Sequence, residues 1–329
     1  MRLSFTKPHC AAIAMSSLLS VAQVSHAAGY VYSNLNFPFS GIVVQGVRGI
    51  NANGEAVGNS FNPPNGGRQT AYLYNGAGFT TLNVPSSNVT YAMGLNNSGE
   101  VVGYFDTYTA SYATLQQGFL YTGGSYTILP VSEADGINNS NEIVGNSANG
   151  AFIDNGGVFT YLNYPNAIPG GTNAYGINDN GEVVGTFVDA VGNHGFTYYN
   201  GIFTPFDAPN AAPGATQAYG VNNSGEVAGT FQDAHGVSHG FLDNGGNFIT
   251  LNCPFSQSSF TAPSGSGSTY AYGINAAGAI VGAYQGADRQ YGYKAVLSAV
   301  PLPAAFWQLG SAFAAFGGFS RRKCLLRRN

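Results

Sequence analysis

Charged residues are scarce in this chain of 329 residues, because Asp, Glu, Lys and Arg together make up only 8% of it. Long amphipathic helices need a polar face rich in Glu, Lys and Arg, so this scarcity excludes a helical bundle. Cysteine is also rare. Cys10 and Cys324 lie in the terminal segments discussed below, which leaves Cys253 alone. A chain that has lost both ends therefore cannot form an intramolecular disulfide.

Basic residues are few in the central part of the chain. All fifteen acidic residues lie between residues 28 and 300, where the only basic ones are Arg48, Arg68, Arg289 and Lys294. The body therefore has a net charge of −11, whereas the full chain has −4. A body with this charge is repelled by phosphate backbones, so nucleic-acid binding is not expected.

Small and aromatic residues are abundant. The chain has 47 glycines, 21 tyrosines and 22 phenylalanines, and its hydrophobic fraction of 44% is too high for a disordered chain. This composition suits short strands joined by tight turns.

One unit is repeated six times. It begins with a Gly-Ile-Asn-x-x-Gly-Glu-Val-Val-Gly motif, followed by a Gly-Phe-Leu-Tyr-like segment and an aromatic-Thr-x-Leu-Asn-x-Pro segment. The starts are spaced by 45, 42, 40, 44 and 53 residues, at Gly49, Gly94, Gly136, Gly176, Gly220 and Gly273. The motif predicts four short strands, with tight turns such as residues 178–181 between the first two. Four strands in about 40–45 residues is typical of a propeller blade.

The two ends of the array predict how it closes. The last unit has three strands, ending around residues 296–297, and lacks a fourth. Residues 32–38 match a fourth strand and precede any first strand. We therefore expect an all-β, six-bladed propeller-like ring closed by an N-terminal strand, which removes exposed sheet edges. An open solenoid with capped ends is the alternative.

The units resemble the HAF repeats, an extracellular repeat family named for a His-Ala-Phe at the start of the third strand. The matching residues are 194–196 and 239–241, both His-Gly-Phe, and the resemblance covers roughly residues 30–297. It implies an extracytoplasmic location and a propeller-like fold, and it implies no reaction.

Residues 1–28 have the three parts of a secretory signal. Arg2 and Lys7 supply positive charge, residues 11–24 are mostly apolar, and cleavage is expected after Ala27 or Ala28. A short buried helix would not explain this order of charge, apolar run and small residues.

The C-terminal segment, residues 299–329, also has three parts. A Val300-Pro301-Leu302-Pro303-Ala304 motif precedes an apolar run over residues 304–319, and a basic cluster of Arg321, Arg322 and Lys323 follows. The run is slightly short for a membrane span, but Trp307 and the basic cluster fit one with a cytoplasmic C-terminus. This tail resembles the PEP-CTERM sorting signals, which implies recognition and cutting near the prolines by an exosortase in the inner membrane of a Gram-negative bacterium. An ordinary membrane anchor is the alternative.

Several repeated side chains were considered as chemical groups. Five units place a glutamate at the start of the second strand, where the sixth has Ala279; these are Glu55, Glu100, Glu142, Glu182 and Glu226. Paired carboxylates can hydrolyse glycosides, but a catalytic pair needs two different environments, so a turn-supporting or solvated role is favoured.

The loops after the second strand bring acids and imidazoles together in the sequence: Asp106, Asp189, Asp233, His194, His235 and His239. Asp233, His235 and His239 are residue types that could bind a metal ion, but His194 and His239 are repeat equivalents, which favours a structural role at a strand start. Residues 178–181 lack the acids of a calcium loop, and Cys253 suits a small half-buried position better than a nucleophile. We therefore assign no catalytic residue, no cofactor and no metal.

The leading hypothesis is a non-enzymatic protein, secreted across the inner membrane and sorted by an exosortase to the cell surface or the extracellular biofilm matrix. Its expected partners are the secretion machinery, the exosortase and extracellular polysaccharide, with transient membrane anchoring by the tail. One alternative is a carbohydrate-active hydrolase or lyase, which requires unrepeated acids at one end of the channel, such as Asp135, Asp207, Asp233 and Asp288. Another is a lectin-like module with several equivalent sites.

Overall fold

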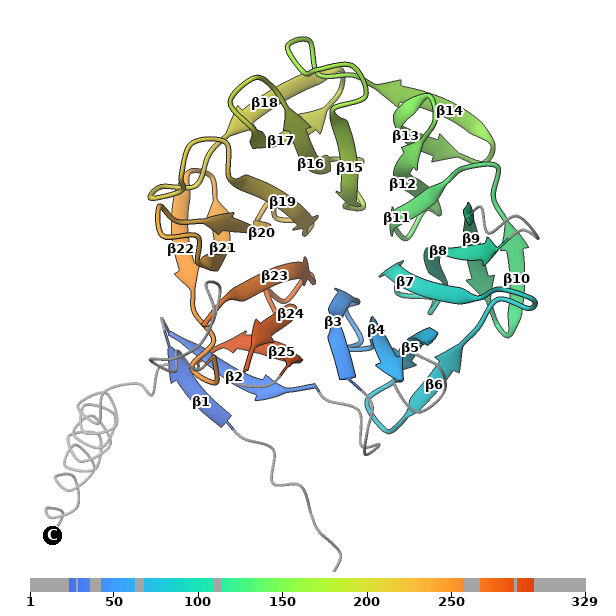
Figure 1. The fold of residues 1–329 in the computed structure, drawn as a ribbon, viewed down its shortest axis with the longest axis horizontal. Coiled ribbons are helices and arrows are strands. Elements are labelled where there is room, and N and C mark those ends of the chain that lie inside the picture. The colour runs from blue at the N-terminus through green and yellow to red at the C-terminus, as the bar shows by residue number, and fades with distance from the viewer. Residues whose placement is uncertain are drawn as a thin grey trace, which may run out of the picture.

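The computed structural model describes residues 24–27, 29–35, 43–62, 68–108, 114–256, 267–286 and 289–298. These residues form six antiparallel sheets arranged as blades around a central channel, with the first strand of each repeat nearest the channel (Figure 1). The predicted six-bladed propeller is confirmed.

Five blades are made from consecutive strands. Blade 1 has β3 (Val43–Ile50), β4 (Ala56–Asn62), β5 (Arg68–Tyr74) and β6 (Phe79–Leu82), and blade 2 has β7 (Val89–Leu95), β8 (Val101–Tyr108), β9 (Thr114–Thr122) and β10 (Ser125–Ile128). Blade 3 has β11 (Glu133–Ile137), β12 (Glu142–Ser147), β13 (Gly150–Asn155) and β14 (Val158–Leu162), and blade 4 has β15 (Thr172–Ile177), β16 (Val183–Val188), β17 (Asn193–Tyr199) and β18 (Ile202–Phe206). Blade 5 has β19 (Thr216–Val221), β20 (Val227–Gln232), β21 (Ser238–Asn244) and β22 (Asn247–Leu251).

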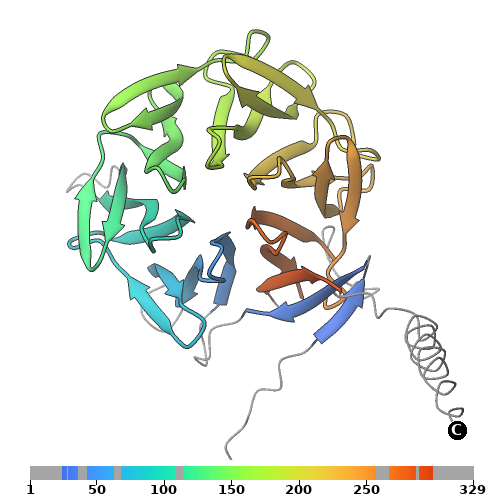
Figure 2. The ribbon, with the colours of Figure 1, turned by 180° about the vertical axis from the view of Figure 1, so that it is seen from behind.

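Blade 6 joins both ends of the fold. Its strand order is β1-β2-β25-β24-β23, in which β23 (Thr269–Ile274), β24 (Ile280–Gln285) and β25 (Gln290–Leu297) come from the last repeat. The strand β2 (Tyr30–Asn34) supplies the missing fourth strand and pairs antiparallel with β25, as both views show (Figures 1 and 2). The predicted closure is confirmed, although the strand begins two residues earlier than expected; residues 36–38 of the predicted segment lie outside the described part.

A further strand, β1 (Val24–Ala27), pairs with the outer edge of β2. It lies within the predicted signal sequence and was not expected as a strand. Residues 1–23 and Ala28, which complete that predicted signal, lie outside the described residues, as does the whole of the predicted sorting tail, residues 299–329.

The hydrophobic core lies between the blades. Each cluster of buried residues combines side chains from two neighbouring blades; one brings Val57, Ala71 and Leu82 of blade 1 against Ala92, Leu95 and Val101 of blade 2. The cluster at the closure contains Tyr30 and Tyr32 of β2, both with no exposed surface. Because each blade buries one face against the next, stability depends on a closed circle of neighbours.

The glycine of each Gly-Ile-Asn motif is required by the close approach of the inner strands. A Cβ atom on Gly176 would lie 2.5 Å from the carbonyl oxygen of Tyr219 in the next blade, and one on Gly273 would lie 2.8 Å from that of Arg48. These separations are shorter than any ordinary contact, so a larger residue would force the blades apart.

A β-bulge precedes this glycine in every inner strand. In β11, for example, Ala134 pairs with Gly145 and Gly136 with Val144, which leaves Asp135 unpaired. The six bulged residues are Arg48, Met93, Asp135, Tyr175, Tyr219 and Tyr272. A bulge frees one residue from the ladder and redirects its side chain, so these positions are available for a function other than pairing.

Candidate functional site

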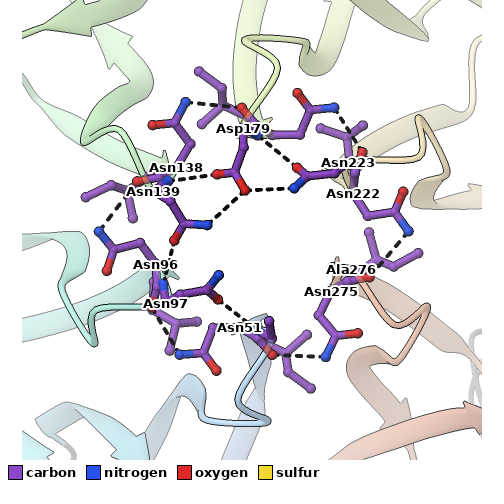
Figure 3. Close-up of a pocket in the computed structure, with 18 residues that line it drawn as sticks. Asn51, Asn96, Asn97, Asn138, Asn139, Asp179, Asn222, Asn223, Asn275 and Ala276 are labelled. Carbon is purple, nitrogen blue, oxygen red and sulfur yellow. Dashed lines mark hydrogen bonds between the residues drawn. The ribbon is translucent and has the colours of Figure 1, made fainter.

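The asparagine of each motif closes one end of the channel. We call these six residues the asparagine ring: Asn51, Asn96, Asn138, Asn178, Asn222 and Asn275 (Figure 3). Each side-chain amide donates a hydrogen bond to the backbone carbonyl of the ring residue in the next blade, at 2.9 to 3.5 Å, and Asn275 donates to Asn51 to complete the circle. The ring therefore joins every pair of neighbouring blades.

The repeated glutamates hold these amides in place. In five blades a glutamate Oε2 accepts a second hydrogen bond from the same asparagine Nδ2, at 2.6 to 3.1 Å. The glutamate backbone N–H donates back to the asparagine Oδ1, and in blade 6 Ala279 keeps this backbone bond. The glutamates support the turn and the ring, as the sequence predicts.

A second set of polar side chains comes from residues that directly follow ring asparagines, and those of Asn139, Asp179 and Asn223 point toward the centre of the opening (Figure 3). The backbone N–H of Ala52 donates to Asn97, that of Asn97 to Asn139, that of Asn139 to Asp179, and that of Asp179 to Asn223. The Asp179 carboxylate also accepts from the side chains of Asn139 and Asn223, at 2.8 and 2.7 Å. Partial burial raises its pKa, but these hydrogen bonds outweigh that effect and lower it. The polar groups at this end therefore hydrogen-bond largely to one another.

The other end of the channel is not the same in every blade: three blades place a tyrosine there, and the other three place Arg48, Met93 and Asp135. The bulged residues line a cavity of about 240 Å³ there, together with Tyr104 and Glu133. We call it the tyrosine cavity: Arg48, Met93, Tyr104, Glu133, Asp135, Tyr175, Tyr219 and Tyr272. It breaks the repeat symmetry and gathers aromatic, cationic and acidic groups, which makes it the candidate functional site.

Aromatic rings form one side of this cavity. The ring centroids of Tyr175 and Tyr219 are 5.2 Å apart and tilted by 45°, and those of Tyr219 and Tyr272 are 5.3 Å apart and edge-on. The Arg48 guanidinium lies over the Tyr272 ring, 4.1 Å from its centroid, where a cation–π contact stabilises it. Blade 2 supplies Tyr104 on β8, which lines the cavity and stacks on its strand neighbour Tyr91 of β7 with ring centroids 4.5 Å apart.

Carboxylates line another part of the cavity. Asp135 is 5% exposed, and its Oδ2 accepts a hydrogen bond from Asn146 Nδ2 at 2.9 Å. Burial, followed by the nearby Glu133 charge, raises the pKa of Asp135 well above its usual value. Burial also raises the pKa of Glu133, against hydrogen bonds from Asn146 and Gln116. The cavity therefore holds two acids whose proton affinity is increased by their surroundings.

The sequence predicted one member of this site. Of the four unrepeated acids considered, Asp135 lies in the tyrosine cavity, Asp207 and Asp233 lie in the histidine contacts described next, and Asp288 lies outside the described residues. Sequence reasoning missed Arg48, Glu133, Tyr175, Tyr219 and Tyr272. The sequence does contain a signal for most of these residues. The position directly before the motif glycine varies between Arg, Met, Asp and Tyr, whereas the motif that follows it is repeated.

The two motif histidines connect a loop to the end of the fourth strand. His194 lies between Asp189 and Asp207, with ring nitrogens 3.2 and 3.0 Å from their carboxylates, and it stacks on Phe187. His239 occupies the same place in blade 5, between Asp233 at 3.1 Å and Asn252 at 2.7 Å. The predicted structural role at a strand start explains these contacts.

The Asp233 carboxylate should make the stability of the propeller depend on pH in the acidic range. Hydrogen bonds from the Val237 backbone and from His239 lower its pKa to about 2. Its stabilising effect is therefore present above its unfolded pKa of about 3.9 and is lost as the pH falls toward 2. We expect the stability deficit of Asp233→Asn in urea unfolding to shrink between pH 5 and pH 2.

A control with the opposite sign is available in the same blade. Burial raises the pKa of Asp243, so the stability it contributes is present at low pH and is lost as the pH rises. Asp243→Asn should therefore gain stability relative to the parent chain as the pH rises. A deficit of Asp233→Asn that stays constant down to pH 2 would contradict the assignment.

The structure also bears on three further expectations from the sequence: the role of Cys253, metal binding and membrane crossing. Burial raises the pKa of the Cys253 thiol to about 12, and the residue is 2% exposed, so it is buried more deeply than expected. Within the described residues, no three His, Cys, Asp or Glu side chains come together in a way that could hold a metal ion. The described part also has no helix that is long and apolar enough to cross a membrane, and the predicted span over residues 304–319 lies outside it.

Comparison with known proteins finds solved structures that the chain resembles at low sequence identity. No family model and no curated protein matches the chain, so the resemblance to HAF repeats and PEP-CTERM signals stays a prediction. Among solved structures, the propeller domain of the Trilobed protease from Pyrococcus furiosus is 10% identical, with 82% of this chain and 93% of that one covered and a TM-score of 0.47. The fucose-specific lectin from Aleuria aurantia is 12% identical over 69% and 92%, with a TM-score of 0.41.

A third neighbour is a sialidase from Trypanosoma rangeli, 10% identical over 90% of this chain and 62% of that one, with a TM-score of 0.43. These three proteins have different activities, and none of the likenesses bears on the ligand or activity of this chain.

Proposed function

We propose that this protein is an exported, non-enzymatic surface or matrix protein whose propeller binds carbohydrate in the tyrosine cavity. The observation that carries the proposal is the loss of repeat symmetry at that end of the channel. Six equivalent bulges place four kinds of side chain around one cavity, which is lined in all by four tyrosines, one arginine, one methionine and two acids. A purely structural array has no need for such differences.

The chemistry of the cavity suits a saccharide. Aromatic faces pack against the apolar C–H faces of a sugar ring, while carboxylates and guanidinium groups exchange hydrogen bonds with its hydroxyls. The Tyr219 hydroxyl already donates to Gln217 at 2.9 Å, which fixes the orientation of its ring. A cavity of about 240 Å³ has room for a single sugar unit and not for a long chain segment.

The aromatic faces should carry most of the affinity. Tyr219→Ala removes the ring that contacts both Tyr175 and Tyr272. We expect it to weaken the binding free energy by about 2 kcal/mol, roughly 30-fold in Kd. The measurement is direct binding to a panel of oligosaccharides. The matched control is Tyr199→Ala, because Tyr199 is 49% exposed and does not line the cavity. Equal binding by both variants would rule out the cavity as the binding site.

A carbohydrate-active hydrolase is the second candidate. The raised pKa values of Asp135 and Glu133 favour it, because a carboxyl group with increased proton affinity is better suited to donate a proton to a glycosidic oxygen. The two candidates differ in one result: an enzyme releases new reducing ends from a bound oligosaccharide, and a binding protein does not.

Export and sorting are the other half of the proposal. They rest on the signal-like residues 1–28 and on the tail with its Val300–Ala304 motif, apolar run and basic cluster. Peptide mapping of native membrane and secreted fractions should find chains that begin near residue 28 or 29 and end near Pro303. A chain that still ends at Asn329 and stays in the inner membrane would contradict exosortase processing.

A further inference from the structure

The charges of the tyrosine cavity are unequal. Arg48 is the only cationic side chain among its lining residues, whereas Glu133 and Asp135 are both acidic. A third carboxylate, that of Asp106 on β8, is close enough to raise the pKa of Glu133, and its Oδ1 is buried with no hydrogen-bond partner in the described part. With all groups ionised, this end of the channel carries more negative than positive charge.

The charged groups of the cavity are only partly satisfied within the described residues. The Arg48 guanidinium rests on the Tyr272 ring at 4.1 Å, and its Nε is buried there without a hydrogen-bond partner. The Asp135 side chain is 95% buried, yet Asn146 provides the one hydrogen bond that its carboxylate receives within the described residues. A buried carboxylate has at least four acceptor positions, so a ligand that donates several hydrogen bonds would satisfy it.

We propose that the cavity selects saccharides that carry a protonated primary amine, with the ammonium group against Asp135 and Glu133 and the sugar ring on Tyr175 and Tyr219. This inference rests on the proposed carbohydrate binding and specifies its ligand class. An ammonium group supplies three donors and a positive charge, and it is also attracted to tyrosine faces. A neutral sugar would leave the acids without a counter-charge.

The pH dependence has a definite sign. The groups that face Asp135 are Glu133 on β11, Arg48 on β3, Tyr104 on β8 and Tyr175 on β15, and Asp106 on β8 faces Glu133. An ammonium ligand favours the ionised acids, so binding releases protons and tightens as the pH rises through the range in which the acids titrate. A uronic-acid ligand held by Arg48 would bind more weakly over the same rise.

The test uses the full chain and three probes: an oligomer of glucosamine, the same oligomer fully N-acetylated, and an oligomer of a uronic acid. We expect the amine oligomer to bind at least 10-fold more tightly than the acetylated one at a pH at which its amino groups are protonated. Asp135→Asn should remove that preference, so that the variant binds the two oligomers with affinities within about 2-fold of each other. Thermal unfolding of Asp135→Asn verifies that the variant is folded, and Glu133→Gln provides a second variant with the same expected result.

The possible results distinguish amine selection from the carbohydrate binding on which it rests. If the acetylated oligomer binds as tightly as the amine oligomer, or the uronic-acid oligomer binds more tightly, amine selection is wrong and carbohydrate binding stands. If none of the three probes binds, both are wrong for these ligands. A preference for the amine that survives in both acid variants would overturn the assignment to Asp135 and Glu133.

Discussion

A chain that begins at residue 43, without β1 and β2, is expected to lose the cooperative unfolding of the ring. β2 supplies five pairs to β25, and its Tyr30 and Tyr32 side chains have no exposed surface. Burying an aromatic side chain is worth about 3 kcal/mol, so the loss is on the order of 5 kcal/mol or more. A domain has only about 5–15 kcal/mol in total, and the deletion also opens an unpaired edge on β25.

The control is a chain that begins at Gly29, which lacks β1 and keeps β2. We expect it to unfold as one cooperative transition at nearly the same temperature as the full chain. A synthetic peptide of residues 29–35 should restore part of the stability of the shorter chain by pairing with β25. Equal thermal stability of the chains starting at 29 and 43 would show that β2 does not close the ring.

Replacing Asn178 by alanine is expected to destabilise the propeller by about 2–4 kcal/mol. Its amide donates to Glu182 Oε2 at 3.1 Å and to the Asn222 carbonyl at 2.9 Å, and its Oδ1 accepts from two backbone N–H groups. The residue is 3% exposed, so alanine would leave buried groups without partners. Differential scanning calorimetry should show a melting temperature lower by roughly 5–15 °C.

Two variants calibrate this effect. Glu182→Gln keeps an oxygen that can accept from the Asn178 amide, so it should cost less than about 1 kcal/mol. Thr204→Ala, on the exposed face of β18, should be within about 0.5 kcal/mol of the parent chain. If Asn178→Ala is no more destabilising than Thr204→Ala, the asparagine ring does not hold the blades together.

The architecture could be predicted from sequence because a blade is specified locally. The turn residues, the strand alternation and the proline that ends the fourth strand recur six times, and the unpaired fourth strand near residue 32 indicates closure. The asparagine ring could not be predicted in this way. A repeated Asn suggests a turn, but its amide reaches the next blade, and that contact exists only once the ring is assembled.

The tyrosine cavity could not be predicted from the sequence, for a different reason. Its bulged residues are 40 to 53 positions apart in the sequence. The bulge that directs each one toward the channel interrupts the two-residue alternation by which an inward position is recognised. An unrepeated acidic residue can be recognised in the sequence by its type, and Asp135 was predicted at one end of the channel on that basis. Tyr175, Tyr219 and Tyr272 could not, because tyrosine is frequent throughout the chain and most aromatic side chains pack between blades.

The central claim is that one asymmetric cavity binds carbohydrate without altering it. Calorimetric titration of the full chain with a binding oligosaccharide, followed by assay of the same sample for new reducing ends, tests it most directly. The account predicts a stoichiometry of one per chain and an unchanged oligosaccharide. A stoichiometry near six would place binding on the repeated parts of the blades, and new reducing ends would make the protein an enzyme; either result would contradict the account.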